Sequence, residues 1–586
     1  MTETQVGREP IQIVEIRQPL CENTFGSAPC TATGTGDTKC YNTRSTCQDT
    51  ANFALGTPLS LFFSTGKVAD RGVEGVPYLI PSLLSVSTTP TKINMAVSDR
   101  NVQGLGNRAV CSITFSDHPH SDRRVDPYVT GRSWNPLSAD RGSFWTRWKV
   151  RNIYRTNIVL VVYEGYAGQT LAEMSSRQYF MQSVTGPGSG GKVTIQGKDI
   201  LTKLEERKAQ VPLASPGVLY SSIGTEETSF VVANAVVADY PSSGTLRIND
   251  EIMTYTSTQL ENNGLVFSGI ERGTDYTAAA THDVDDDVQA CVRYTEITLY
   301  DLLVDLLNVK GGIDTDYLDL TGWTTEIDNY LSFVRLNTLL PAPTAVTKLL
   351  TELQEQLLFY MWWDEREAKV KLKSIRGFSS PPPTLTDTAN ILEGSLAVTD
   401  LYKNRISQLW VDYKQIDFTK KADDPEAYSS GFVLADLASE TPEQHGEPSI
   451  RKIYARWLNK SIYINTLATR LLRRNTPVPQ QCEFQLDAKD RQYGVGDTVY
   501  LDHHLLIDEF GNRKIEQWTI ISYEENKYGH SVKYVAENTN LYGKIFTVLE
   551  DPAVDYPGAA SAAYQAAYIG DSDGLLSDGN PSARIT

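Results

Sequence analysis

Short apolar or alternating runs dominate the chain, and few stretches have helical spacing. Alternation of apolar and polar side chains predicts strands with one buried face. Such runs, bounded by Gly, Pro or Asp, occur at 11–16, 59–64, 91–98, 109–117, 158–168, 179–184, 192–201, 404–417 and within 483–538. They predict a protein that is built mainly from sheets.

Two segments have the three- and four-residue spacing of an amphipathic helix. In the first, 344–359, this spacing joins Val346, Leu349, Leu353 and Leu357. Thr344 can cap its start. Residues 466–474 predict a second helix that ends in two arginines, and 360–375 predict a hairpin.

The interval 214–292 differs in composition from its flanks. It holds strand-like stretches separated by Gly and Asn turns, and about 75 residues can fold alone. The flanking stretches, 198–213 and 296–307, both look helical and would form one layer without the interval. The pattern therefore predicts a small all-β module that interrupts a helical layer.

Three other stretches have compositions of their own. Residues 134–151 combine Trp, Phe, Arg and Lys, which interfaces favour. The simpler interpretation is the edge of an amphipathic strand that packs on a core. Residues 429–449 are polar and predict an excursion from the fold. Residues 551–586 are rich in Ala, Ser, Gly and Asp and predict an extended arm.

Together these patterns predict an α+β, strand-dominated chain of several domains. One hydrophobic core rarely exceeds roughly 300 residues, and this chain has 586. The predicted units are an N-terminal segment with a cysteine loop (1–50), the first part of the main domain (51–213), the inserted β module (214–292), an α/β part with the helix 344–359 (293–388), a C-terminal β domain (389–550) and the arm (551–586).

The charge is acidic. Lys and Arg number 54 and Asp and Glu number 72, a formal net charge of −18. Sequence-independent DNA binding needs a basic excess, so the charge argues against it. No apolar run has the length of a membrane span, and the N-terminus lacks the apolar stretch of a signal peptide. We therefore expect synthesis in a cytosol.

The strongest candidate site is a cluster of four cysteines, Cys21, Cys30, Cys40 and Cys47. The residues between them are mostly small and polar, so the segment buries too little apolar surface to order itself. The spacing has neither the close Cys pair of structural zinc sites nor a ferredoxin pattern. Three interpretations remain: an iron–sulfur cluster on four thiolates, two disulfides, or four free thiols. Because a cytosol disfavours disulfides, we expect a metal or cluster first.

Histidines beside acidic residues give weaker candidates for metal or acid–base chemistry. They are His118 and His120 within 117–126, His282 within the acidic loop 282–287, and His503–His504 with Asp508 and Glu509. A solvated polar turn is the simpler interpretation of the first two. Adjacent residues of a strand point to opposite faces, so the His pair should make a poor joint site. The chain has no nucleophile-elbow, phosphate-loop or HExxH motif, and we expect no enzyme.

Much of the chain resembles tail-tip hub proteins of long-tailed bacteriophages and of gene transfer agents. The cysteine segment 21–49 is the most specific part. The stretches 116–152, 191–212, 300–365 and 568–585 also look like this family, and 244–282 resembles a small β unit inserted in many phage structural proteins.

This resemblance implies a hub fold shared with contractile-tail baseplates and assembled as a homotrimeric ring. Related tail-tip proteins, including that of phage lambda, hold an iron–sulfur cluster on a comparable cysteine set. The resemblance thus implies a cluster, of the 4Fe–4S type, on Cys21, Cys30, Cys40 and Cys47. The ring would lie at the virion tail tip, below the distal tail protein and around the path of the tape measure protein and DNA.

The same resemblance implies a central fibre or receptor-binding proteins below the ring, with the arm 551–586 docked onto the fibre. An acidic channel wall would repel phosphates, so DNA would pass without specific binding. Two other functions remain open: a host-surface adhesin that binds through the inserted module, and a cell-wall-degrading tail-tip enzyme.

Overall fold

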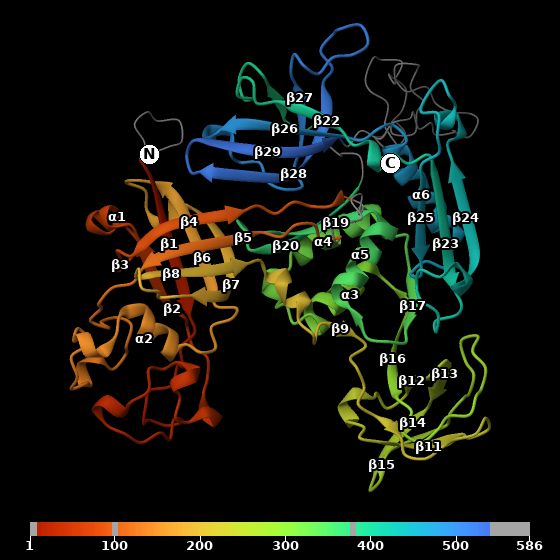
Figure 1. The fold of residues 1–586 in the computed structure, drawn as a ribbon, viewed down its shortest axis with the longest axis horizontal. Coiled ribbons are helices and arrows are strands. Elements are labelled where there is room, and N and C mark those ends of the chain that lie inside the picture. The colour runs from red at the N-terminus through yellow and green to blue at the C-terminus, as the bar shows by residue number, and fades with distance from the viewer. Residues whose placement is uncertain (1–8, 96–103, 376–381, 539–586) are drawn as a thin grey trace, which may run out of the picture.

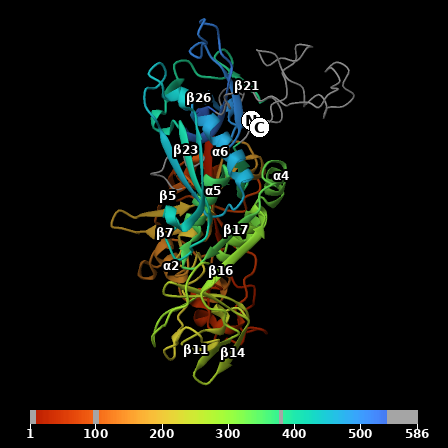
Figure 2. The same cartoon turned by 90° about the vertical axis from the view of Figure 1, so that its right-hand side faces the viewer.

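The computed structural model describes residues 9–95, 104–375 and 382–538. Strands dominate these residues, which confirms the α+β, strand-dominated class (Figures 1 and 2). No helix within the described ranges is long and apolar enough to cross a membrane. The predicted arm at 551–586 lies outside them.

The N-terminal part of the chain forms an eight-stranded sheet, drawn red to yellow in Figure 1. In spatial order its strands are β3 (Leu79–Ile80), β2 (Leu59–Ser64), β1 (Pro10–Gln18), β6 (Val159–Tyr166), β7 (Ser175–Thr185), β8 (Lys192–Lys198), β5 (Val110–Ser116) and β4 (Leu83–Thr89). Helix α1 (Gly66–Arg71) follows β2. Helix α2 (Phe144–Arg151) places Trp145 against Phe63 and Phe115 of the sheet.

Helix α2 corrects the expectation of a strand edge within 134–151. Its first turn is capped by Asp117, whose Oδ1 accepts from the Trp145 N–H at 3.0 Å and whose Oδ2 accepts from the Ser143 hydroxyl. A carboxylate at this end satisfies a free N–H group and matches the helix dipole. The cap lies 28 residues away in sequence, so the local pattern did not reveal the helix.

The centre of the molecule is a helical layer on a hairpin. It consists of α3 (Leu299–Val304) with a π-helical continuation (Asp305–Lys310), α4 (Leu320–Tyr330), α5 (Val346–Leu357) and the hairpin β19 (Phe359–Asp364)–β20 (Lys369–Ser374), beside the short pair β9 (Gln210–Val211)–β18 (Thr344–Ala345). Helix α5 and the hairpin confirm the helix and the hairpin predicted for 344–359 and 360–375. Thr344 does not cap the helix, because it lies in β18 and the N-cap position is Ala345. Every apolar residue that set the helical spacing of α5 is buried.

A small β unit extends from this centre, at the lower right of Figure 1. One sheet has the order β10 (Val218–Leu219), β11 (Ser229–Ala233), β15 (Gly264–Ser268) and β14 (Ser257–Glu261); the other has β13 (Glu251–Tyr255), β12 (Gly244–Ile248), β16 (Val288–Ile297) and β17 (Leu336–Leu340). The unit has its own core, from Leu219 to Ala290. Strand β16 continues beyond it to pair with β17, which ties the unit to the centre.

The C-terminal part holds a six-stranded and a three-stranded sheet. The first has the order β21 (Thr384–Thr386), β27 (Thr498–Asp502), β28 (Glu516–Lys527), β29 (Ser531–Asn538), β26 (Gln480–Asp487) and β22 (Ala397–Asp400). The second has the order β24 (Tyr428–Ala435), β23 (Gln408–Gln415) and β25 (Ile450–Ala455), beside helix α6 (Ser461–Asn475). Strand β24 lies largely in the predicted excursion 429–449, so that prediction was wrong for its first part.

A buried carboxyl lies where the first sheet joins the helical layer. Asp199 follows β8 and is 1% exposed, with an Arg108 Nη1 at 3.9 Å. Burial raises its pKa to about 7, although the charge of Arg108 opposes the shift. In the unfolded chain an Asp titrates near pH 3.9. Between these values the folded state retains a proton that the unfolded state has lost.

This difference predicts that Asp199 lowers the free energy of unfolding as the pH rises from about 4 to about 7. Replacement Asp199→Asn should remove that contribution, on the order of a few kcal/mol. The free energy of unfolding of the variant, relative to that of the parent, should therefore be higher at about pH 8 than at about pH 5, measured by urea unfolding. An equal difference at both pH values would contradict the assignment.

Candidate functional site

The four predicted cysteines lie around one small cavity. Cys21, Cys30, Cys40 and Cys47 all line it, are half-buried and are present as free thiols. The segment makes short 3-10 turns, and its Cys21 N–H donates to the Asn42 carbonyl at 2.7 Å. Between positions 21 and 49 only Phe25 and Thr43 are buried, as the polar composition predicted.

The predicted iron–sulfur cluster is corrected by this geometry. The cavity measures about 10 Å³, the space of about one water-sized sphere, whereas a 4Fe–4S core has eight atoms. The site shown is a set of four thiols without an iron–sulfur site. Whether the thiols bind another ligand stays a prediction.

An arginine from outside the segment holds its backbone. Arg132 donates to the carbonyls of Asp37, Lys39 and Cys40, each at 3.1 Å, and its side chain is 1% exposed. Asp126 pairs with the same guanidinium, at 3.0 Å between Nη2 and Oδ1. A buried charge is stable only when it is paired and hydrogen-bonded, and here the segment supplies half of the partners.

Helix α2 supplies the second contact. The ring of Tyr41 lies between two guanidinium groups, with Arg132 at 4.0 Å and Arg151 at 3.9 Å from its centroid. The Arg151 carbonyl, at the end of α2, accepts from Thr43 Oγ1 at 2.6 Å and from the Ser45 hydroxyl. The basic and aromatic stretch 134–151 thus anchors the cysteine segment within one chain.

The polar stretch 117–126 is part of the same anchor. Asp122 accepts from Arg147 at 2.9 Å and from Arg151 at 2.8 Å. Burial alone would raise the pKa of Asp122, but its hydrogen bonds and the two arginine charges outweigh burial and hold it at about 2. The His120 ring accepts from the Asp122 N–H at 3.0 Å. Both side chains therefore shape a polar turn, as the simpler interpretation predicted, but the turn is buried and not solvated.

His282 belongs to an ion-pair network of the small β unit. Its Nε2 lies 2.9 Å from Glu251 Oε2, and Arg272 pairs with both Glu251 oxygens at 2.7 and 2.8 Å. The N–H groups of Gly273 and Ala280 complete the set. The buried carboxylate of Glu251 fixes the loops around it.

The His503–His504 pair departs from the prediction of opposite faces. The two rings stack, with centroids 4.3 Å apart, because they follow the end of β27 and do not alternate. With Asp387 they form the one group of three potential ligands that converges within 4.8 Å in the described ranges. Hydrogen bonds from His504 and Arg513 lower the pKa of Asp387. Arg513 contacts both Asp387 oxygens at 3.1 Å and would compete with a metal ion.

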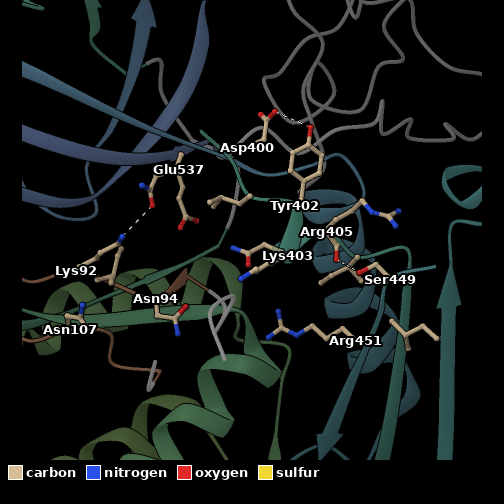
Figure 3. Close-up of a pocket in the computed structure, with 16 residues that line it drawn as sticks. Lys92, Asn94, Asn107, Asp400, Tyr402, Lys403, Arg405, Ser449, Arg451 and Glu537 are labelled. Carbon is tan, nitrogen blue, oxygen red and sulfur yellow. Dashed lines mark hydrogen bonds between the residues drawn. The ribbon is translucent and has the colours of Figure 1, made fainter. Parts of the chain in front are cut away.

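A cavity of about 790 Å³ lies between the first domain and the C-terminal sheets (Figure 3). Sequence patterns gave no indication of it, because its walls come from six separate stretches of the chain. Its charged lining consists of Lys92, Lys403, Arg405 and Arg451 against Asp400 and Glu537. The local balance is positive in an acidic chain, so the cavity suits an anionic group. It contains no His or Cys.

No protein-family model and no curated protein matches the chain. Among solved structures, the chain is similar to a tail protein from Neisseria meningitidis MC58, with 10% identity, a TM-score of 0.35, and 75% of this chain and 90% of that one covered. A chain of a native gene transfer agent virion has 10% identity and a TM-score of 0.30, covering 65% and 82%. A type VI secretion component from E. coli, itself similar to two T4 bacteriophage tail proteins, has 7% identity and a TM-score of 0.30, covering 82% and 86%.

The chain is thus similar to phage tail and gene transfer agent proteins, the classes that its motifs resemble. These identities and scores are too low to transfer residue roles or assembly. The function has to be argued from the contacts of this chain.

The Arg132 contacts generate a prediction about the cysteine segment. Arg132→Ala removes three bonds to backbone carbonyls and one side of the Tyr41 sandwich. Hydrogen bonds to a charged group contribute about 2 kcal/mol, so local opening of 21–49 should become about thirtyfold more frequent. Limited proteolysis under native conditions should show cleavage within 21–49 accelerated accordingly.

The matched control is Arg123→Ala, an exposed arginine nearby that makes no described contact to the segment. It should leave the cleavage rate unchanged. Equal rates for the two variants would show that Arg132 does not hold the segment.

Proposed function

We propose that the chain is a structural hub of a phage-type tail tip. In this role three copies form a ring that joins a distal tail protein on the tube side to a central fibre. The ring encloses the passage for DNA and the tape measure protein. A net charge of −18 per chain would keep the wall of that passage repulsive to phosphates.

The observation that supports a structural role is the protonation state of the carboxylates beside the candidate histidines. Asp122, Glu251 and Asp387 are each held by an arginine and by further hydrogen bonds. A general acid or base needs a pKa near the working pH, whereas these pairings keep all three carboxylates ionised. The clusters that resembled chemistry from sequence instead fix loops.

The assembly is tested on the full chain. Native mass spectrometry and negative-stain electron microscopy should show a ring with threefold symmetry around a central passage. A monomer at micromolar concentrations would contradict the hub. Clearing of peptidoglycan in a zymogram would support the cell-wall-degrading alternative.

We also propose that the four cysteines act as one unit that ties the segment 21–49. Burial raises the pKa of the Cys40 thiol, and negative charge on Cys47, Cys30 and Cys21 would raise it further. Without a partner the Cys40 thiol therefore stays protonated, and the four sulfur atoms can be joined either by a cation that displaces their protons or by covalent pairing as two disulfides.

If the four cysteines stabilise the segment as one unit, loss of any one of them removes the stabilisation that all four provide. Cys40→Ser should therefore increase proteolysis of 21–49 as much as replacement of all four cysteines, with Cys291→Ala as the distant control. Elemental analysis and intact mass measure bound metal and disulfides, respectively. Independent, additive effects of the four substitutions would contradict a single unit.

A further inference from the structure

The outer face of the three-stranded sheet carries a cluster of exposed apolar residues. On the inner face, Leu409, Val411 and Ile453 are buried in the central core. On the outer face, Trp410 of β23 lies opposite Val433 of β24. Val433 is 61% exposed and Trp410 is 38% exposed. Outer positions of such sheets are normally polar.

The neighbouring outer positions extend this face. Ile450 of β25 is half exposed, and Lys452 lies beside Trp410 in register, with its Nζ 5.9 Å from the ring. We refer to Trp410, Val433, Ile450 and Lys452 as the sheet face. Contiguous exposed apolar residues, with a tryptophan among them, are typical of an interaction surface.

A second exposed apolar surface lies on the connection from β27 to β28, which projects at the top of Figure 1. Leu505, Ile507 and Ile515 are more than half exposed, and Phe510 is 81% exposed. We refer to residues 503–515 as the tip hairpin. Its strands pair at Ile507 and Arg513.

The tip hairpin is held in a defined conformation. Arg513 pairs at its base with Asp387 and Asp502, at 3.1 and 3.0 Å. At the turn, Asp508 Oδ1 accepts from the N–H groups of Phe510 and Asn512, at 2.9 and 2.7 Å. A loop that is already ordered loses little entropy on binding. The exposed apolar side chains of the tip hairpin are therefore held in a fixed arrangement.

We propose that the tip hairpin of one copy binds the sheet face of a second copy, with Phe510 against Trp410 and Glu509 near Lys452. This contact deepens the proposed hub, on which it rests. Both surfaces belong to the same chain, and within one copy they lie apart (Figures 1 and 2). Contact between two different surfaces is heterologous, and such contacts form a ring where the rotation between copies closes, as the proposed hub requires. The opposite charges of Glu509 and Lys452 favour this pairing.

The contact is tested first by cross-linking. A photoreactive benzoylphenylalanine replaces Phe510 in the full chain, and isotopically labelled and unlabelled copies are mixed. Cross-links should join 510 to 408–412, 430–435 or 450–454 of a differently labelled copy. Cross-links to another surface, or only within one copy, would overturn the proposal.

Substitutions provide a quantitative test. Phe510→Asp and Trp410→Ala should each weaken self-association about tenfold or more, measured by analytical ultracentrifugation. The control is Leu260→Asp, an exposed leucine of the small β unit, which should change nothing. Lys452→Glu should also weaken association, and adding Glu509→Lys should restore it.

The outcomes separate the two proposals. If the parent chain does not self-associate, both the trimeric hub and this contact are wrong. If it associates but Phe510→Asp, Trp410→Ala and Lys452→Glu have no more effect than the control, the hub stands and this contact is wrong.

Discussion

The N-terminal segment depends on contacts with side chains that are far away in sequence. A stretch in which only Phe25 and Thr43 are buried cannot order itself by burial. Arg132 and Arg151 supply what is missing, because each contacts the Tyr41 ring and hydrogen-bonds through its side chain or carbonyl. This fixes the four thiols around one cavity before any ligand or bond joins them. The thiols can therefore reinforce an arrangement that the arginines already define.

The same principle recurs at other irregular places of the fold. Asp122, Glu251 and Asp387 each fix a loop through an arginine, and Asp117 fixes the start of α2. The pairs of Asp122 and Glu251 are buried or partly buried, where removal of one partner would leave a charge without compensation. Loops fixed in this way keep one conformation. The same pairing removes the protonation changes that acid–base catalysis needs.

Local periodicity predicted the elements in which the spacing of apolar residues matches the face that is buried. Helix α5 and the hairpin β19–β20 bury residues at the spacing seen in the sequence, so their positions were confirmed. Helix α2 was missed because its cap is Asp117, far away in sequence. Strand β24 was missed because its apolar run is short, Phe432–Ala435, shows no alternation of apolar and polar residues, and lies between polar stretches. The convergence of four cysteines was predicted as a ligand set, but the size of the cavity they line could be known only from the structure.

Strand β24 also shows why a polar composition can hide an interface. Its inward residues pack on the core, which fixes the register of the strand. Once the register is fixed, Val433 must face outward beside Trp410. Exposure of apolar surface to water costs roughly 25 cal/mol of free energy per Å², so this exposed face is unfavourable in an isolated chain. That cost disappears when a second apolar surface covers it, and the rigid tip hairpin is such a surface. In the proposed contact, the unfavourable exposure in one copy would become a driving force for association with a second copy.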